Sequence, residues 1–343
     1  DRLAQLVDKS LVQVDEDDGN ARYGLLETIR QYARDRLLEA GKAEEVRDAH
    51  LRYFLGLAEA TSPDISFGLL LAAETDWLDD CEREKGNYRA AMEWGLERDP
   101  EAALRLAGAI VGFWELRGYR REALPLVKMA LERVAALPPA EGDAARSRLT
   151  LQAHALVALS NMGIGLVGGQ EGIEANQEAV RLFRELGDQR GLAFALSHLG
   201  FLSAIRGQAA LAEGFLEEAI LEARQSGAKL ALAMALGTQA QFVLMQRGEI
   251  DRVQANLEES ARLAREAGSA WGTAMGDLGL AELAVARGDW KEAEARALEA
   301  KGLFAQFRDP LMVNATQSRL AHIARGAGRL DEAVSIYRQT IVM

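Results

Sequence analysis

The fold of this chain is decided by the stretch "MQRGEIDRVQANLEESARLAREAG", residues 245–268, because its pattern occurs four times. The other copies are "AIRGQAALAEGFLEEAILEARQSG" (204–227), "VARGDWKEAEARALEAKGLFAQFRD" (285–309) and "GAGRLDEAVSIYRQTIVM" (326–343). Their turn glycines are Gly207, Gly248, Gly288 and Gly328, at intervals of 41, 40 and 40 residues. Five residues later come Ala212, Val253, Ala293 and Ala333, and twelve later come Ala219, Ser260, Ala300 and Thr340. Mostly small residues at fixed helical offsets let helices approach closely, so the pattern predicts stacked helix-turn-helix units.

The helix before each turn follows a second rule. Eight and seven residues before the glycine stand Leu199-Gly200, Ala240-Gln241, Leu280-Ala281 and Leu320-Ala321. This resembles the tetratricopeptide repeat (TPR), which has a Leu-Gly pair in its first helix and small residues in its second. The resemblance covers roughly residues 100 to 343. Because the period of 40 exceeds the usual TPR period of about 34, each helix is expected to be about a turn longer.

Two earlier units fit the pattern less closely. One has Gly118, Ala123 and Ala130 at the same offsets. The other has its turn at Val167, and places Leu159, Gly172 and Ala179 at the leucine and small positions. The loop-forming segment "PPAEGDAARS" lies between them and lengthens the interval to 49 residues. We therefore predict an all-α fold, a right-handed superhelical array of about six TPR-like repeats over 99–343. Helical stretches at 44–60, 68–84 and 86–97 form a linker or cap over 42–98.

Residues 1–41 do not follow the repeat. "SLVQVDEDDGNARYGLLE" alternates short apolar runs around an Asp/Gly/Asn turn, which predicts a β-hairpin, with Gly24 standing where a polar strand residue is expected. "TIRQYARDRLLEAG" follows as an amphipathic helix with Ile29, Ala33 and Leu37 on one face and a stop at Gly41. Helix, hairpin and helix in this order predict a small N-terminal winged-helix remnant that carries the hairpin.

The N-terminal segments also resemble a known family. "LVDKSLV", "RYGLLETIRQYARDRL", "HLRYFLGLAEA" and "LDDCEREKGNYRAAMEW" are similar to bacterial STAND-type signalling ATPases and transcription regulators, to which the maltotriose-responsive activator is related in architecture. The resemblance implies an NB-ARC nucleotide-binding domain, then a winged helix, then a TPR-like sensor. No G-x-x-x-x-G-K-[ST] loop occurs in these residues. ATP or ADP is therefore expected only in a domain upstream of residue 1, and the chain reads as a segment of a larger protein.

Composition excludes several classes of function. A net charge of −12 disfavours direct contact with nucleic acid, which requires a basic face. The single cysteine, Cys81, excludes a disulfide framework, and its acidic neighbours are expected to raise its pKa. No apolar run is long enough for a membrane span and no signal peptide is evident, so a cytoplasmic location is expected. None of His50, His154, His198 and His322 has metal-ligand spacing, and no catalytic motif is present, so neither an enzyme nor a metal site is predicted.

The stretch "NMGIGLVGGQEG" contains G-x-G-x-x-G at Gly163, Gly165 and Gly168. In a dinucleotide-binding loop this motif follows a β-strand and opens a helix. Here "LQAHALVALSNM" precedes it with helical spacing, and the 40-residue count places Gly168 in a turn between two helices. We therefore interpret the glycines as repeat-turn and helix-end residues, and predict no cofactor in this segment.

The first helix of each TPR unit lines the concave surface, so its solvent-facing positions are the candidate site. The residues predicted for this groove are His154, Asn161, Phe194, Ser197, Phe201, Thr238, Phe242, Met245, Met275, Leu278, Glu282, His322 and Arg325, with Val157, Ile164 and Ser318 in the same rows. The centre of this surface is apolar and its ends are polar, which indicates a ligand groove with Phe and Met as anchors. The alternative is that these residues pack between helices, with the assigned register off by one.

Two functions remain open. In the first, the chain is a non-catalytic sensor module: an inducer, whether small molecule, peptide or protein, binds the groove and shifts the upstream NB-ARC ATPase between states. In the second, the array is a constitutive protein-interaction scaffold or self-associates. The two differ in whether a complex or dimer forms without a small molecule.

Overall fold

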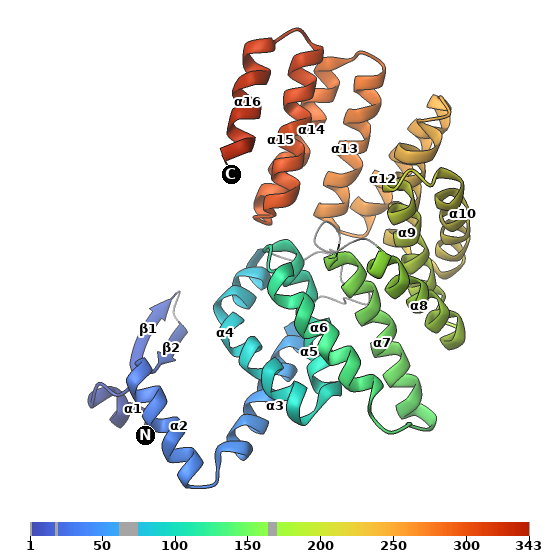
Figure 1. Ribbon diagram of the computed structural model, residues 1–343. Coiled ribbons are helices and arrows are strands. Elements are labelled where there is room, and N and C mark those ends of the chain that lie inside the picture. Colours follow the sequence, from blue (N-terminus) through green and yellow to red (C-terminus); the bar gives the residue numbers. More distant parts are fainter. Residues whose placement is uncertain (1, 18–19, 62–74, 164–169, 343) are drawn as a thin grey trace. The chain divides into compact units, whose positions relative to one another are not determined.

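The computed structural model describes residues 2–17, 20–61, 75–163 and 170–342 (Figure 1). The chain divides into two compact units, Asp1–Tyr53 and Phe54–Met343. The first contains the hairpin and the second contains the helical repeats. Apart from the hairpin, the regular structure in the described residues is helical. The predicted all-α fold of TPR-like repeats is therefore confirmed.

The first unit has the predicted order of helix, hairpin and helix. Its elements are α1 (Arg2–Asp8), β1 (Gln13–Asp17), β2 (Asn20–Gly24) and α2 (Glu27–Glu39). The strands are antiparallel, with Val14 opposite Tyr23 and Gln13 opposite Gly24. Gly24 thus ends the second strand, where the chain turns toward α2.

Helix α2 presents the face that its sequence predicts. Ile29, Ala33 and Leu37 are its partly buried positions, while the residues around them are exposed. Gly41 has φ +63°, a left-handed conformation that ends a helix and favours glycine. The predicted amphipathic helix and its stop are both confirmed.

The second unit consists of helix pairs. The helices are α3 (Ala43–Thr61), which contains the boundary between the units, α4 (Thr75–Arg98), α5 (Pro100–Leu116), α6 (Arg120–Ala135), α7 (Gly142–Met162), α8 (Gln170–Leu186), α9 (Gln189–Ile205), α10 (Ala209–Ser226), α11 (Lys229–Gln239), η1 (Ala240–Leu244), α12 (Ile250–Glu266), α13 (Ala270–Ala286), α14 (Trp290–Gln306), α15 (Pro310–Gly326) and α16 (Leu330–Val342). The helix expected over 44–60 is confirmed as α3. The expected break between 84 and 86 is wrong, because α4 runs through Gly86 as one helix. The loop expected after Leu137 is shorter than predicted, since α7 begins at Gly142.

The turn glycines on which the repeats were aligned all adopt the same conformation. Gly118, Gly207, Gly248, Gly288 and Gly328 have φ between +72° and +80°. Only glycine enters this region without a steric penalty from Cβ. The repeat is therefore visible in the sequence because the backbone requires glycine at each of these turns.

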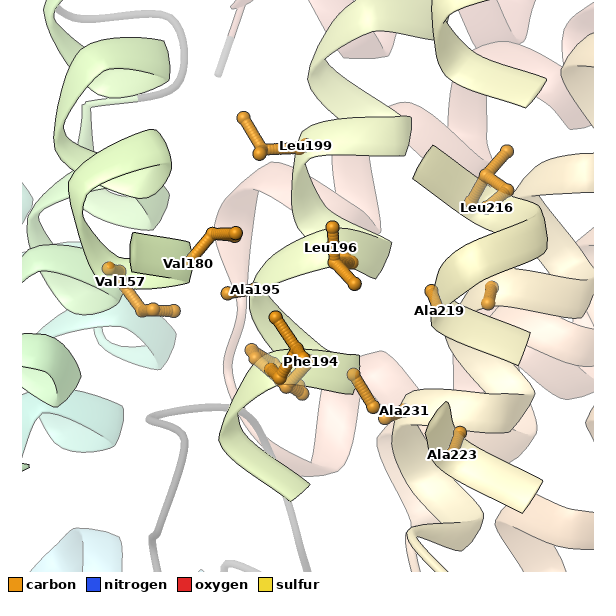
Figure 2. Packing of buried hydrophobic residues seen from close by; sticks show 14 of the residues in the cluster. Val157, Val180, Phe194, Ala195, Leu196, Leu199, Leu216, Ala219, Ala223 and Ala231 are labelled. Atoms are coloured by element: carbon orange, nitrogen blue, oxygen red, sulfur yellow. The ribbon is translucent and has the colours of Figure 1, made fainter. Parts of the chain in front are cut away.

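The small residues of the second helices are the points of closest helix packing. Ala212, Val253 and Ala293 are fully buried and Ala333 is nearly so, and Ala219 and Ala300 are fully buried as well. Leucine and phenylalanine fill the space around them. In Figure 2 one core cluster places Phe194 and Leu196 of α9 between Val180 of α8 and Ala219 of α10.

One repeat contains an irregular helix that accounts for the unequal glycine intervals. Residues Ala240–Leu244 form η1, a π-helical segment that continues α11 directly. A π segment accommodates one extra residue within an α-helix. The interval from Gly207 to Gly248 is 41 residues, and the following intervals are 40. We conclude that the extra residue of this repeat is absorbed in η1.

Candidate functional site

The predicted groove residues lie on α7, α9, α11 with η1, α13 and α15, the first helices of their repeats. Ile164, together with the turn expected at Val167, lies outside the described residues. The remaining residues fall into three groups. One group lines a pocket, one forms a partly exposed aromatic contact beside it, and one is buried between helices.

The pocket lies where the end of η1 faces α13 and α15. It has a volume of about 210 Å³ and is lined by Met245, Leu278, Ala281, Glu282, Val285, Ala286, Arg319, His322 and Ile323. Met245, Leu278, Glu282 and His322 are among the residues predicted for the groove. The turn after η1 and two helices, α13 and α15, therefore bring four of the predicted side chains together at one place.

An ion pair crosses this pocket. Glu282 Oε1 on α13 lies 2.7 Å from Arg319 Nη2 on α15. Burial raises the pKa of Glu282, while Arg319 and His322 act in the opposite direction. Burial therefore penalises the charge of the carboxylate, and the guanidinium of Arg319, itself 54% exposed, compensates for this only in part.

Sequence reasoning missed Arg319, the cation of this pair. It lies 37 residues from Glu282 and next to Ser318, which had been assigned to the groove. The repeat pattern could have suggested it, because an acidic residue at one groove position favours a basic partner on the neighbouring first helix. Val285 and Ile323, which supply apolar lining, were also missed.

An aromatic contact joins α9 to η1 beside the pocket. The ring of Phe201 meets that of Phe242 edge to face, with centroids 6.0 Å apart. Phe201 also stacks on His198, at 6.4 Å. Both phenylalanines are partly exposed. Because Phe242 and Met245 lie on the same short segment, the aromatic contact and the pocket are adjacent along the chain.

Other predicted groove residues are buried between helices. Phe194 and Val157 belong to the core cluster, and are 5% and 1% exposed. Ser197 is fully buried, with its hydroxyl 2.8 Å from the carbonyl oxygen of Ala193 and 3.1 Å from that of Ala231. Thr238 is 7% exposed. For these residues the expectation of an open surface is corrected, and the alternative of packing between helices describes them.

The π segment explains the position of Thr238. The groove positions were counted backward from the turn glycine Gly248, across the extra residue in η1. Counting forward from Gly227 instead aligns Gly237, and not Thr238, with Ser197 and Leu278 of the neighbouring repeats. The register in this helix was therefore shifted by one residue, which on a helix corresponds to a rotation of about 100°.

Asn161 on α7 is 5% exposed, and neither of its side-chain polar atoms has a hydrogen-bond partner among the described residues. Its neighbour in sequence, Ser160, belongs to a buried polar cluster with Asn176 on α8 and His198 on α9. His198 Nδ1 lies 3.4 Å from Ser160 Oγ and 3.3 Å from Asn176 Nδ2. Burial lowers the pKa of His198 to about 3, so the imidazole is neutral at ordinary pH.

The last predicted residues lie around these features. His154 contacts the ring of Phe183 at 5.4 Å, and burial lowers the pKa of its imidazole. Met275 packs on the cluster formed by Ala274, Ala300 and Phe304. Arg325 is exposed near the end of α15, and Ser318 is partly buried.

The His, Cys, Asp and Glu side chains were also compared across the part of the chain that the structure describes. Within the described residues, no cluster of three or more His, Cys, Asp or Glu could hold a metal ion. Burial, more than the acidic neighbours, raises the pKa of Cys81 to about 12, so the predicted direction of this shift is confirmed. None of the described helices combines the length and apolar character required to cross a bilayer.

Comparison with known proteins relates both parts of the chain to regulators. Residues 1–38 match a model of the winged helix-turn-helix domain. Over 213 residues the chain is 34% identical to proteins of Mycobacterium tuberculosis and Mycobacterium bovis that are named as HTH-type transcriptional regulators. The match covers 61% of this chain and 23% of those proteins. The chain thus spans about a quarter of the length of these relatives.

Solved structures are similar to the chain in fold. Aspartyl phosphate phosphatase F from Bacillus subtilis superposes with a TM-score of 0.61 at 11% identity, covering 92% of this chain and 74% of the phosphatase. A Rap protein complexed with competence and sporulation factor superposes with a TM-score of 0.57 at 14% identity, covering 87% and 76%. The chain is thus similar in sequence to proteins named as transcriptional regulators, and similar in fold to helical-repeat proteins.

Proposed function

We propose that this chain is the non-catalytic sensor module of a longer transcription regulator, and that an inducer binds between η1, α13 and α15. The observation that carries this proposal is the pocket itself. There, Met245 and Leu278 supply apolar surface and Glu282 and Arg319 supply polar groups. An apolar pocket with a few convergent polar groups is the usual form of a small-molecule site.

The sequence relatives favour a regulatory role for the module. Their names describe transcriptional regulators, and the winged-helix match at residues 1–38 places a segment of that type in this chain. Its own net charge of −12 disfavours direct DNA binding by the repeats. We infer that DNA contact belongs to another part of the full-length protein, and that inducer binding controls an NB-ARC ATPase upstream of the winged helix.

Two aromatic side chains of the predicted groove remain partly exposed to solvent. Phe201 and Phe242 remain partly exposed although both are large and apolar. Exposed aromatic side chains beside a pocket commonly mark binding sites for small molecules or peptides. The Rap protein with a similar fold was solved with a bound factor, which supports the same use of this type of array.

The test is a thermal-shift screen of the chain against metabolites and short peptides. A ligand at 100 times its Kd stabilises the folded state by about 2.7 kcal/mol, which a melting experiment resolves. Leu278→Glu places a charge on the apolar wall and is expected to abolish the shift. Leu298→Glu, at an exposed position of α14 outside the pocket, is the matched control.

Two outcomes would contradict the sensor proposal. In the first, no compound shifts the melting temperature. In the second, light scattering shows a stable dimer or partner complex without any small molecule, and Leu278→Glu leaves that complex intact. The second result would favour the constitutive scaffold.

A further inference from the structure

The pocket between η1, α13 and α15 has one ion pair beside an apolar wall, and the Arg319 end of that pair is open to solvent. Its charged lining consists of Glu282 and Arg319, which contact each other at 2.7 Å, and His322 is the remaining titratable group. The other lining side chains are Met245, Leu278, Ala281, Val285, Ala286 and Ile323. A ligand here meets a positive and a negative group side by side, with an apolar wall next to them.

This charge arrangement selects against ligands that carry a single charge. An anion would have to approach Arg319 while lying close to the carboxylate of Glu282, and a cation would meet the reverse conflict. Like charges this close repel each other, and although the Arg319 side chain is 54% exposed, the Glu282 side chain is only 28% exposed. A ligand that carries both charges avoids the conflict. Its positive group can lie beside Glu282 and its negative group beside Arg319, so the ion pair stays intact.

The size of the pocket further limits the class of ligand that can bind. Its volume of about 210 Å³ is below the range of roughly 300–1,000 Å³ that is usual for drug-sized ligands. Nucleotides and oligosaccharides are therefore too large to enter it whole. A molecule with a few heavy atoms and a short apolar chain fits, and Met245 can adapt to its shape because its side chain is unbranched and flexible.

We propose that this pocket binds a zwitterion of the α-amino-acid class with an apolar side chain. Its ammonium group pairs with Glu282, and its carboxylate pairs with Arg319, with His322 beside it. The aliphatic side chain lies against Leu278 and Val285. This inference rests on the proposed sensor function and names the class of inducer that the module recognises.

The ligand chemistry is tested by isothermal titration calorimetry on the whole chain with a matched series. L-Leucine and L-methionine are the zwitterions, 4-methylpentanoate lacks the ammonium group, and 3-methylbutylamine lacks the carboxylate. We expect an amino acid to bind at least tenfold more tightly than either single-charge analogue, and glycine to bind more weakly because it has no side chain. Equal affinity for leucine and 4-methylpentanoate would overturn the assignment.

Variants place the binding at this pocket. Glu282→Gln and Arg319→Gln each remove one end of the ion pair, and each is expected to weaken leucine binding at least tenfold. Arg329→Gln is the control, because it breaks a comparable pair with Glu294 on α14, at 2.9 Å, that does not line the pocket. It is expected to leave the affinity unchanged.

A further variant guards against effects on folding. Val285 is partly exposed, so Val285→Phe fills the pocket and keeps its charges, and circular dichroism verifies the fold of every variant. If Val285→Phe or both charge variants bind leucine as wild type does, the pocket is not the site.

The failure of this inference is distinguishable from the failure of the sensor proposal. If no amino acid binds, but another compound shifts the melting temperature and Val285→Phe abolishes that shift, the zwitterion assignment is wrong and the sensor proposal stands. If no compound binds wild type in either experiment, both are wrong.

Discussion

Gly276 on α13 lies directly against Ala261 on α12. A Cβ atom at Gly276 would stand 2.8 Å from the Cβ of Ala261 and 2.9 Å from its Cα. A Cβ atom essentially never comes this close to an atom of another helix, and Ala261 is fully buried. The two helices therefore pack in contact only because one residue has no side chain and the other has a single methyl group.

Gly276→Ala is expected to destabilise the protein by about 1–3 kcal/mol, because the added methyl group overpacks a rigid contact. The control is Gly214→Ala on α10, where a Cβ meets nothing within 4 Å. There the higher helix propensity of alanine is expected to stabilise the protein by up to about 1 kcal/mol. Urea denaturation measures both. A Gly276→Ala variant as stable as wild type would show that α12 and α13 separate without penalty.

The turns between repeats provide a second test. Gly187, Gly227 and Gly268 have φ between +67° and +71°, and the corresponding residue in the next turn is Arg308, with φ +50°. A side chain in this left-handed region costs about 1–2 kcal/mol. The ion pair of Arg308 with Asp79 is exposed, at 3.6 Å, and offsets little of this cost.

Arg308→Gly is therefore expected to raise the stability by about 0.5–1 kcal/mol, since the relief of strain exceeds the entropy that glycine adds to the unfolded chain. Arg308→Lys keeps both the charge and the strain, and is expected to match wild type. Thermal melts of wild type, Arg308→Gly and Arg308→Lys measure these differences in stability. If the lysine and glycine variants melt together, the backbone at this turn carries no strain.

The repeat could be predicted from the sequence because its determinants are local. Each turn glycine is dictated by its own backbone conformation, and each alanine such as Ala212 or Ala293 is dictated by the helix packed on it. The sequence determinants of the N-terminal hairpin are equally local. The winged-helix segment was predicted from the order of helix, hairpin and helix, and the match to residues 1–38 supports it.

The candidate site was harder to predict, because it depends on rotations of about 100° that a repeat count does not fix. The π segment shifted the assignment of Thr238, and Ser197 satisfies its hydroxyl inside the bundle instead of facing a ligand. The partnership of Glu282 with Arg319 joins separate repeats. Only the three-dimensional stacking brings these two side chains together.

The π segment itself can be tested by a deletion. Removing Gln241 restores the 20-residue spacing between turn glycines that the neighbouring first helices have, so we expect a regular α-helix and a change in stability within about 1 kcal/mol. Residues before the deletion rotate relative to Met245, so any ligand of the pocket should bind more weakly. Circular dichroism and melting measure the fold, and the thermal-shift screen measures binding. A variant that unfolds would show that η1 is required by the packing.

Glu115 predicts a pH dependence in the alkaline direction. This carboxyl group on α5 is 5% exposed, and burial raises its pKa to about 8, with Arg120 opposing and Asp309 adding to the shift. Between about pH 4.5 and pH 8 the folded protein retains a proton that the unfolded chain loses, so the stability falls as pH rises by up to about 1.4 kcal/mol per unit. Glu115→Gln removes this loss.

The Glu115→Gln variant is expected to match wild type near pH 4.5 and to exceed its stability by roughly 2–4 kcal/mol near pH 8.5. Chemical denaturation across this range measures the difference. Glu122→Gln, at an exposed position of α6, controls for the loss of one negative charge. If the free energies of unfolding of wild type and Glu115→Gln changed with pH in the same way, the buried carboxyl group would be ionised without penalty.

His198 predicts a pH dependence of the opposite sign. Burial lowers its pKa to about 3 between Ser160 and Asn176, whereas in the unfolded chain histidine titrates near 6.5. Below about pH 6.5 the unfolded state takes up a proton that the folded state refuses, so the stability falls by up to about 1.4 kcal/mol per unit down to about pH 3. His198→Asn is expected to reduce this slope between pH 6 and pH 4, whatever its effect at neutral pH.

The pKa of His154 is also lowered by burial, so the double variant with His154→Asn should have the shallowest slope. Urea denaturation at half-unit steps of pH measures it, and an unchanged slope in both variants would mean that neither imidazole is excluded from protonation in the folded protein.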